Sequence, residues 1–308
     1  MNKQLLLSEF LTTPWALMPE RLQAMSGILT RWSAAEPPSE ETLFQVNTDR
    51  VLRDSRKQMA AASAGSGIAV LPLYGVVTQR GNMVDDISGP GSTSTQQFSA
   101  VLRQMLSDDT VGQILIDIDS PGGSVYGVAE LASEIVKARA QKPIIAVANS
   151  LAASAAYWLG CSASEFYVTP GGEVGSIGVW QAHFDYSEAL KEDGVKPTLI
   201  SAGKFKVEGN PYVPLDEQAQ AFMQSRVDDY YNAFVKAVAI GRGVSVNDVR
   251  TGMGEGRVLG ADAAMAQSMV DGIASFEDVL TKMQANIRST PVRNTSRLKQ
   301  ARDALALI

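Results

Sequence analysis

Ser154 stands in a setting that could support nucleophilic attack on a carbonyl group. It follows an apolar run and lies within Asn149-Ser-Leu-Ala-Ala-Ser-Ala-Ala-Tyr157, with two alanines on each side. Small neighbours let the start of a helix pack closely and leave room for a substrate backbone. In the first turn of that helix, free N–H groups favour negative charge, and the N–H of Ala155 could donate to an oxyanion. A serine in a tightly packed structural helix would show the same pattern.

A glycine-rich turn could supply the remaining oxyanion donors. Residues 119–124, Asp-Ser-Pro-Gly-Gly-Ser, lie between an expected strand and an expected helix. Gly122 and Gly123 let the backbone turn sharply, and their N–H groups could bind an anion or a developing oxyanion. A simple strand-to-helix turn remains the alternative. The GxxxxGK[ST] spacing of a phosphate-binding loop is absent.

The chain also offers a lysine as a base. Ser176 lies in Gly-Ser-Ile-Gly-Val, and Lys204 and Lys206 lie in Ser-Ala-Gly-Lys-Phe-Lys. A lysine acts as a base only when burial lowers its pKa from about 10.4 toward neutrality. A hydroxyl such as that of Ser176 can hold the neutral amine in position. In an extended segment both lysines point to one face, so spacing alone does not choose between them.

Single copies of two residue types exclude several kinds of site. With one cysteine, Cys161, and one histidine, His183, the chain cannot form an internal disulfide, a cysteine-rich metal site or a multi-histidine zinc site. We expect Cys161 to be a small buried apolar residue and His183 a structural or surface residue. No metal or other cofactor is expected.

Composition indicates a folded, water-soluble domain. The 308 residues are 45% hydrophobic and 19% charged, with a formal net charge of -6, so nothing suggests a nucleic-acid partner or an anionic membrane surface. The opening residues do not read as a signal peptide, and no apolar run approaches the roughly 18 residues of a membrane span. We expect a cytoplasmic protein.

The elements that must position these residues alternate between strand and helix from Gly67 onward, which predicts an α/β fold with parallel pairing. Residues 1–66 read as a helical extension and linker, 67–285 as the main domain and 286–308 as a basic tail. Pro72 suggests that the first strand is an edge or carries a bulge. Strands are predicted at 68–73, 111–118, 143–148, 176–179 and 198–201, and helices at 98–105, 125–138, from 152, and at 216–240.

Residues 67 to about 282 resemble the serine peptidases related to signal peptide peptidase A, which have the ClpP/crotonase-type α/β fold of repeated ββα units. The resemblance runs through ordered motifs at 119–124, 152–157, 175–179, 203–206, 256–262 and 269–272. It implies Ser154 as nucleophile, Lys206 as general base and Ser176 as the residue that orients the lysine. Gly122 or Gly123, together with Ala155, would form the oxyanion hole; we favour Gly123. No cofactor is implied.

The opening segment 13–20 resembles the phage-encoded branch of that family, the prohead and minor capsid proteases. The resemblance implies an endopeptidase that trims scaffold, portal or coat protein in the host cytoplasm during head assembly. It also implies a homo-oligomeric ring, and leaves open whether the dyad is completed between subunits. Membrane-anchored members carry an N-terminal transmembrane helix, which we do not find here.

Two other functions remain open. A ClpP-like Ser/His/Asp peptidase would use His183 with Asp228 or Asp229, although the residues around His183 are unlike those of ClpP. A noncatalytic capsid or scaffold-binding protein would keep the fold without activity, which would leave Ser154, Ser176 and Lys206 unused. An acyl-CoA enzyme of the crotonase type is disfavoured for the same reason.

Overall fold

The computed structural model describes residues 13–18, 67–80 and 92–289. The helices expected before residue 67, most of the loop expected at 81–94 and the residues after 289 lie outside the described part. The strands are β1 (Trp15–Leu17), β2 (Ile68–Tyr74), β3 (Val76–Thr78), β4 (Ser92–Ser94), β5 (Gln113–Ser120), β6 (Gly122–Ser124), β7 (Ile144–Ala153), β8 (Glu165–Val168), β9 (Glu173–Gly175), β10 (Val258–Gly260) and β11 (Gly272–Ile273). The helices are α4 (Thr95–Ser107), α5 (Val128–Ala138), α6 (Ala155–Gly160), α7 (Ser187–Glu192), α8 (Glu217–Arg242), α9 (Val246–Thr251), α10 (Ala261–Ala266) and α11 (Phe276–Ser289), with a 3-10 turn at Met253–Gly256.

A seven-stranded sheet forms the centre of the described chain. Five of its strands pair in the order β10-β9-β7-β5-β2. β8 also pairs with β7, and β11 pairs with β8. The central strands β2, β5, β7 and β8 pair in parallel, an arrangement that requires crossover connections such as helices. The predicted α/β fold with parallel pairing is confirmed. β2 ends the path, so Pro72 lies in an edge strand among the described residues, as its missing N–H predicted.

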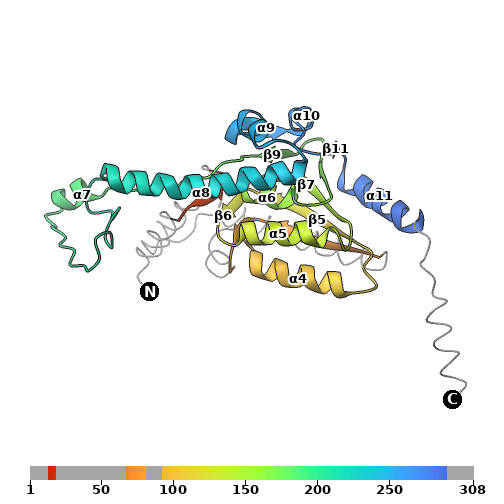
Figure 1. Cartoon of the computed structure of the whole chain (residues 1–308), viewed down its shortest axis with the longest axis horizontal. Helices are drawn as coiled ribbons and strands as arrows, with labels where there is room; N and C mark the ends of the chain where they lie inside the picture. The colour runs from red at the N-terminus through yellow and green to blue at the C-terminus, as the bar shows by residue number, and fades with distance from the viewer. Residues whose placement is uncertain (1–12, 19–66, 81–91, 290–308) are drawn as a thin grey trace, which may run out of the picture.

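Helices cover both faces of this sheet. Side chains alternate along β5, so Ile114, Ile116 and Ile118 join the core formed with α4, α5, α6 and α8, whereas Leu115 joins the residues of α11. Figure 1 shows α4, α5 and α8 lying side by side over the strands. The buried apolar residues of these helices join this core, whereas Val101 of α4 and Phe222 of α8 are exposed. α11 runs to Ser289, past the domain boundary expected at 285.

A smaller sheet, β1-β6-β3-β4, lies at the glycine-rich turn. Its first strand corrects an expectation, since residues 14–19 were predicted to begin a helical stretch. Trp15 and Leu17 pack on one side of β1 with Val76, and Ala16 packs on the other side in the main core. This alternation is that of a strand. Pro14 and Pro19 bracket the segment, and proline disfavours helical conformation in the residue before it.

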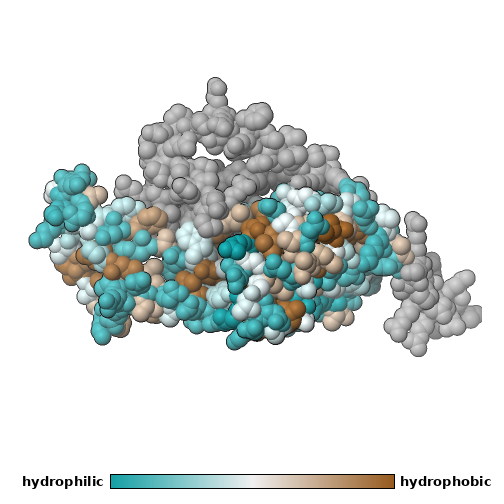
Figure 2. Space-filling model, turned by 90° about the horizontal axis from the view of Figure 1, so that it is seen from above, coloured by the Kyte–Doolittle hydropathy of each residue, from teal (hydrophilic) through white to brown (hydrophobic). Residues whose placement is uncertain are grey.

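Residues 183–216, called here the α7 arm, extend beyond one end of the sheet and are joined to the core by α8 (Figure 1). The strand predicted at 198–201 is not present, and no described strand lies beside it to supply a partner. Several large apolar side chains of the arm are exposed, Ile200 at 96% and Phe205 at 49%. Brown, apolar side chains lie among hydrophilic ones at this end of the molecule in Figure 2.

The last turns of α8 are joined tightly to the core. The Trp158 ring stacks on the Phe234 ring with centroids 4.7 Å apart. At Gly241 the helix lies so close to the end of α6 that an added Cβ would stand 2.1 Å from the Cys161 carbonyl oxygen. The Arg242 guanidinium, 7% exposed, then forms two 2.8 Å bonds with the Asp271 carboxylate.

The ion pair predicts an effect on stability that depends on pH. Partial burial raises the pKa of Asp271, but the hydrogen bonds from Arg242 and from the Phe166 N–H outweigh it and hold the pKa below its usual value. Asp271→Asn should lower the free energy of unfolding by about 1–2 kcal/mol at pH 7, allowing for solvent screening of this partly exposed carboxylate.

A carboxyl whose pKa is lowered by folding stabilises the protein above its unfolded pKa, and that stability is lost as the pH falls through the folded pKa. The difference in unfolding free energy between wild type and Asp271→Asn, measured with urea, should therefore shrink as the pH falls below about 4. Asp109→Asn, at an exposed position, serves as the control and should match wild type. An equal difference at pH 7 and in acid would contradict the assignment.

Candidate active site

Ser154 lies at a sharp turn between β7 and α6. β7 ends at Ala153 and α6 begins at Ala155, so the helix starts later than the expected Ala152 and Ser154 is its N-cap residue. The turn holds Ser154 at φ 56° and ψ -118°, a conformation that is rare for a residue with a side chain. Strained residues cluster at functional sites, and a strained strand-to-helix turn presents the nucleophilic serine in many hydrolases.

Neighbouring backbone groups fix the conformation of this turn. The Ser154 N–H donates to the Gly175 carbonyl at 2.7 Å, and the Ser154 carbonyl accepts from the Trp158 N–H at 2.9 Å. Ala153 and Ala155 on either side have no exposed surface. A larger side chain at either position would have no space, which explains the run of small residues.

The Ser154 hydroxyl is buried and unused in the described structure. The residue is 1% exposed, and its Oγ has no hydrogen-bond partner among the described residues. Buried polar side-chain atoms nearly always have a partner, so this hydroxyl calls for an explanation. A nucleophile held ready for an incoming group provides one.

The glycine-rich turn packs directly against Ser154. At Gly122, where φ is 97°, an added Cβ would stand 2.8 Å from the Ser154 Cβ and 2.3 Å from the Ala16 carbonyl oxygen. The Gly122 N–H donates to the Ser120 hydroxyl, which itself donates to the Gly75 carbonyl. The Gly122 N–H is therefore occupied in the described structure.

The structure brings Ser176 to the same place. Ser176 follows Gly175, whose carbonyl accepts the Ser154 N–H, and is only 9% exposed. Its own N–H donates to the Arg257 carbonyl at 2.8 Å. The strand predicted at 176–179 is misplaced, because β9 comprises Glu173–Gly175 and Ser176 turns away with a φ of 55°. Ser154, Ser176 and the glycines therefore form one cluster.

Lys206 lies outside this cluster in the described chain. It is exposed, and its N–H donates to the Gly203 carbonyl in a turn of the α7 arm, not in an extended segment. Its side chain forms no ion pair or side-chain hydrogen bond with any described residue. Lys204 is also exposed, and its ammonium lies 4.6 Å from the centre of the Phe205 ring.

His183 is not assembled into a catalytic triad. Its Nε2 lies 3.2 Å from the Asn210 carbonyl oxygen within the α7 arm. Asp228 accepts from Gln224, and Asp229 lies 4.0 Å from Arg226, both on exposed turns of α8. Among the described residues, neither aspartate is hydrogen-bonded to His183.

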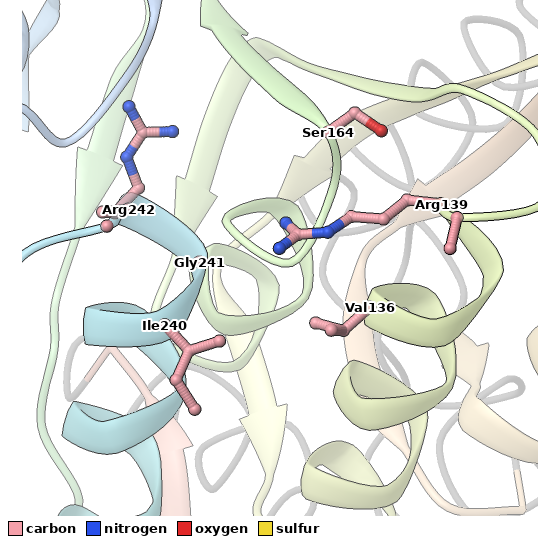
Figure 3. Close-up of a pocket in the computed structure, with 8 residues that line it drawn as sticks. Val136, Arg139, Ser164, Ile240, Gly241 and Arg242 are labelled. Atoms are coloured by element: carbon pink, nitrogen blue, oxygen red, sulfur yellow. The ribbon is translucent and has the colours of Figure 1, made fainter.

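An open hollow of about 610 Å³ lies at the other end of α6. Figure 3 shows Arg139 reaching across it from α5, with Ile240 and Arg242 on the α8 side. The Arg139 guanidinium donates to two backbone carbonyls, at Ser162 and Ala163, and Arg242 pairs with Asp271. These arginines hold helix ends in place, so the hollow offers no comparable reactive group.

Two site features were not predicted from the sequence. The first is that the Gly175 carbonyl accepts a hydrogen bond from the Ser154 N–H. The second is that the Ala16 carbonyl of β1 packs against Gly122. Pro14 and Pro19 were the available signal that residues 15–18 are extended, but nothing in the sequence indicated their partner. In the described residues there is no group of three or more histidine, cysteine or acidic side chains that could hold a metal, and no helix suited to crossing a membrane.

Comparison with known proteins gives a consistent family. The sequence profile of peptidase family S49 matches residues 136–289, half of the chain. The capsid assembly protease C of Escherichia phage lambda is 36% identical over 231 residues, 75% of this chain and 52% of that protein. The head-tail preconnector protein of Enterobacteria phage P21 is 33% identical over 244 residues, 78% of this chain and 48% of that protein.

More distant relatives belong to cellular organisms. Protease 4 of Haemophilus influenzae is 27% identical over 216 residues, 68% of this chain and 34% of that protein. The chain thus spans about half the length of the two phage relatives and a third of the cellular one.

Cys161 provides a test of the site's surroundings. Burial raises the pKa of its thiol to about 12, so the thiolate that reacts with disulfide reagents is scarce at neutral pH. The folded chain should resist a chromogenic disulfide reagent at pH 8, and one thiol per chain should react after unfolding in urea. Rapid reaction of one equivalent in the folded protein would show that the core around α6 is open.

Proposed function

The chain belongs to peptidase family S49, and on that premise we propose that it is a serine endopeptidase with a Ser154/Lys206 dyad. The observation that carries the proposal is the Ser154 hydroxyl, which is buried and unpartnered among the described residues at a strained turn beside Gly122. Ser176 lies close by and would orient the lysine. No metal or nucleotide enters the reaction.

The proposed reaction follows from these groups. Lys206, made neutral by burial, takes the Ser154 proton as Oγ attacks a peptide carbonyl. The N–H groups of Gly123 and Ala155 hold the oxyanion, an interaction worth roughly 3–4 kcal/mol per donor in other enzymes. The first N–H groups of a helix have no partner within it, so Ala155 is well placed. The lysine then protonates the leaving amine, and water hydrolyses the ester.

The proposal places Lys206 in the site of a neighbouring subunit. A lysine exposed to water does not lose its charge readily, so it must be buried before it can act as a base. The α7 arm carries exposed apolar side chains around this lysine, among them Ile200 and Phe205. Packing the arm against a second copy of the chain would cover these side chains and remove water from Lys206. The resemblance to ring-forming peptidases supports this arrangement.

Phage head proteins are the proposed substrates. Two relatives are named as a capsid assembly protease and a head-tail preconnector protein, and both are more than 30% identical to this chain. We therefore expect cleavage of scaffold, portal or coat protein in the host cytoplasm. Because the chain spans only about half the length of these relatives, experiment must decide which head protein is cleaved.

The dyad is tested by a matched pair of lysine substitutions. Lys206→Met should lower the rate of substrate cleavage at least 10³-fold, because it removes the base, as Ser154→Ala should by removing the nucleophile. Lys204→Met should stay within about threefold of wild type, since proton transfer is assigned to Lys206 alone. The variants are incubated with head proteins, and fragments are identified by mass spectrometry.

Three outcomes of that experiment would contradict the proposal. Identical fragments from wild type and Ser154→Ala would show that Ser154 is not the nucleophile. Loss of cleavage in His183→Gln, with Lys206→Met still active, would favour the Ser/His/Asp alternative. Absence of cleavage by wild type on every head protein would favour a noncatalytic capsid-binding role.

Sharing of the dyad between subunits predicts complementation. Ser154→Ala and Lys206→Met are each inactive, but a mixed assembly contains interfaces with an intact serine on one side and an intact lysine on the other. After equal amounts are dissociated and reassembled together, about a quarter of the sites should be intact. Cleavage should recover to about that fraction of wild type. A mixture that stays inactive after verified subunit exchange would place both residues in one chain.

A further inference from the structure

The short strand β1 runs across the candidate active site and is held on both sides. Its register with β6 is antiparallel, with Trp15 opposite Ser124, Ala16 opposite Gly123 and Leu17 opposite Gly122. On its other side, Trp15 exchanges two backbone hydrogen bonds with Trp180, at 2.9 and 3.1 Å. The Trp180 indole N–H also donates to the Leu17 carbonyl at 2.9 Å. Protein domains bind extended peptides by adding them to sheet edges in this way.

The Ala16 carbonyl lies at the place where the chemistry would occur. An added Cβ at Gly122 would meet both this carbonyl oxygen and the Ser154 Cβ. The Val125 N–H donates to the Pro14 carbonyl, and the Met18 N–H donates to the Pro121 carbonyl. These two hydrogen-bonded pairs lie on either side of the three pairs of β1 and β6. Hydrogen-bonded pairs alternate with non-hydrogen-bonded pairs in antiparallel strands, so Ala16 and Gly123 form the bonded pair. The Gly123 N–H, the favoured oxyanion donor, therefore faces the Ala16 carbonyl.

Side-chain packing keeps β1 in this position. Trp15 and Leu17, at 3% and 1% exposure, pack with Val76 and Trp180 on one side of the strand. Ala16 has no exposed surface and faces the main core. Ser154 is itself only 1% exposed, so a protein substrate cannot reach its hydroxyl unless part of the surrounding structure moves. β1 has only three residues and is the segment whose carbonyl already faces the oxyanion donor.

We propose that β1 is a resident inhibitory strand, that is, a strand of the chain itself that blocks its own site. It occupies the groove between β6 and Trp180 in which a substrate strand binds. This inference rests on the proposed peptidase function and adds a form of control to it. Displacement of β1 frees the Gly123 N–H and opens the Ser154 hydroxyl. The substrate that replaces it is an extended peptide with a small residue, at the place of Ala16, between two large apolar residues.

A reversible disulfide between β1 and β6 tests this directly. Trp15 and Ser124 form a non-hydrogen-bonded pair, in which Cα atoms are typically about 4.5 Å apart and within the range of a disulfide. The double variant Trp15→Cys/Ser124→Cys can be clamped by oxidation and released by a reductant. The native Cys161 is buried and should not interfere. Trp15→Cys alone, with and without oxidant, is the control.

Two measurements are made on the full-length protein in both states. The first is labelling of Ser154 by a fluorophosphonate, which should be at least tenfold slower in the clamped state and faster than wild type in the released state. The second is binding of a dye-labelled peptide with the sequence of residues 13–18, followed by fluorescence polarisation. The released state should bind it and the clamped state should not, and a scrambled peptide should bind neither.

The outcomes separate this inference from the proposed function. Equal labelling and equal peptide binding in the two states would overturn the resident strand. Clamp-dependent peptide binding without labelling or hydrolysis in any state would support the strand while contradicting the peptidase. Release of an N-terminal fragment that ends at Ala16 would support the strand, because the cut requires its carbonyl to lie at the nucleophile.

A milder variant covers the case in which the cysteine pair fails to fold. Trp180→Phe keeps an aromatic ring beside Trp15 and removes only the indole N–H that holds the Leu17 carbonyl. Fluorophosphonate labelling of Ser154 should become about three- to tenfold faster, the effect of losing one hydrogen bond. If the rate of Ser154 labelling instead falls in proportion to the loss of thermal stability, β1 is a fixed structural part of the site. The inference would then be wrong.

Discussion

The close approach of β6 to the turn at Ser154 is the constraint on which the rest of the site depends. A side chain at Gly122 would collide with the Ser154 Cβ and with the Ala16 carbonyl, and one at Gly123 would stand 1.9 Å from the Val77 carbonyl oxygen. Glycine at both positions lets three backbone segments meet within van der Waals distance. The alanines beside Ser154 allow the same close packing on the helix side, so the Ser154 hydroxyl and the surrounding backbone groups share one small volume.

Much of this arrangement was open to prediction because it depends on local sequence. The alternation of short apolar strands with amphipathic helices follows from the periodicity of burial, and it correctly predicted an α/β fold with parallel pairing. The glycine pair and the alanine-flanked Ser154 lie at strand ends. In parallel sheets such ends meet on one edge, and the structure places Gly122, Ser154 and Ser176 together there.

The features that escaped prediction depend on partners far away in the chain. β1 is a strand only because residues 122–124 and Trp180 pair with it, and three residues are too few to show a period. The segment at 198–201 has apolar residues suited to a strand, but the described chain offers them no neighbouring edge. Lys206 lies in a turn of the arm, so the comparison of the two lysines in an extended segment does not apply. Its proposed role depends on contacts with a second copy of the chain, so its assignment stays a prediction.

Helix α8 connects the core to the arm. Its 26 residues span roughly 39 Å at 1.5 Å per residue, with the pivot at Gly241 against Cys161 and the lysine-bearing arm at the far end. A tilt of only about 5° at the pivot would sweep the far end through about 3 Å over that length. Misplacement of a catalytic group by about 1 Å can already slow an enzyme about a hundredfold. The close fit at a partly buried glycine, remote from the proposed reacting groups, is therefore one of the contacts that set where the arm lies.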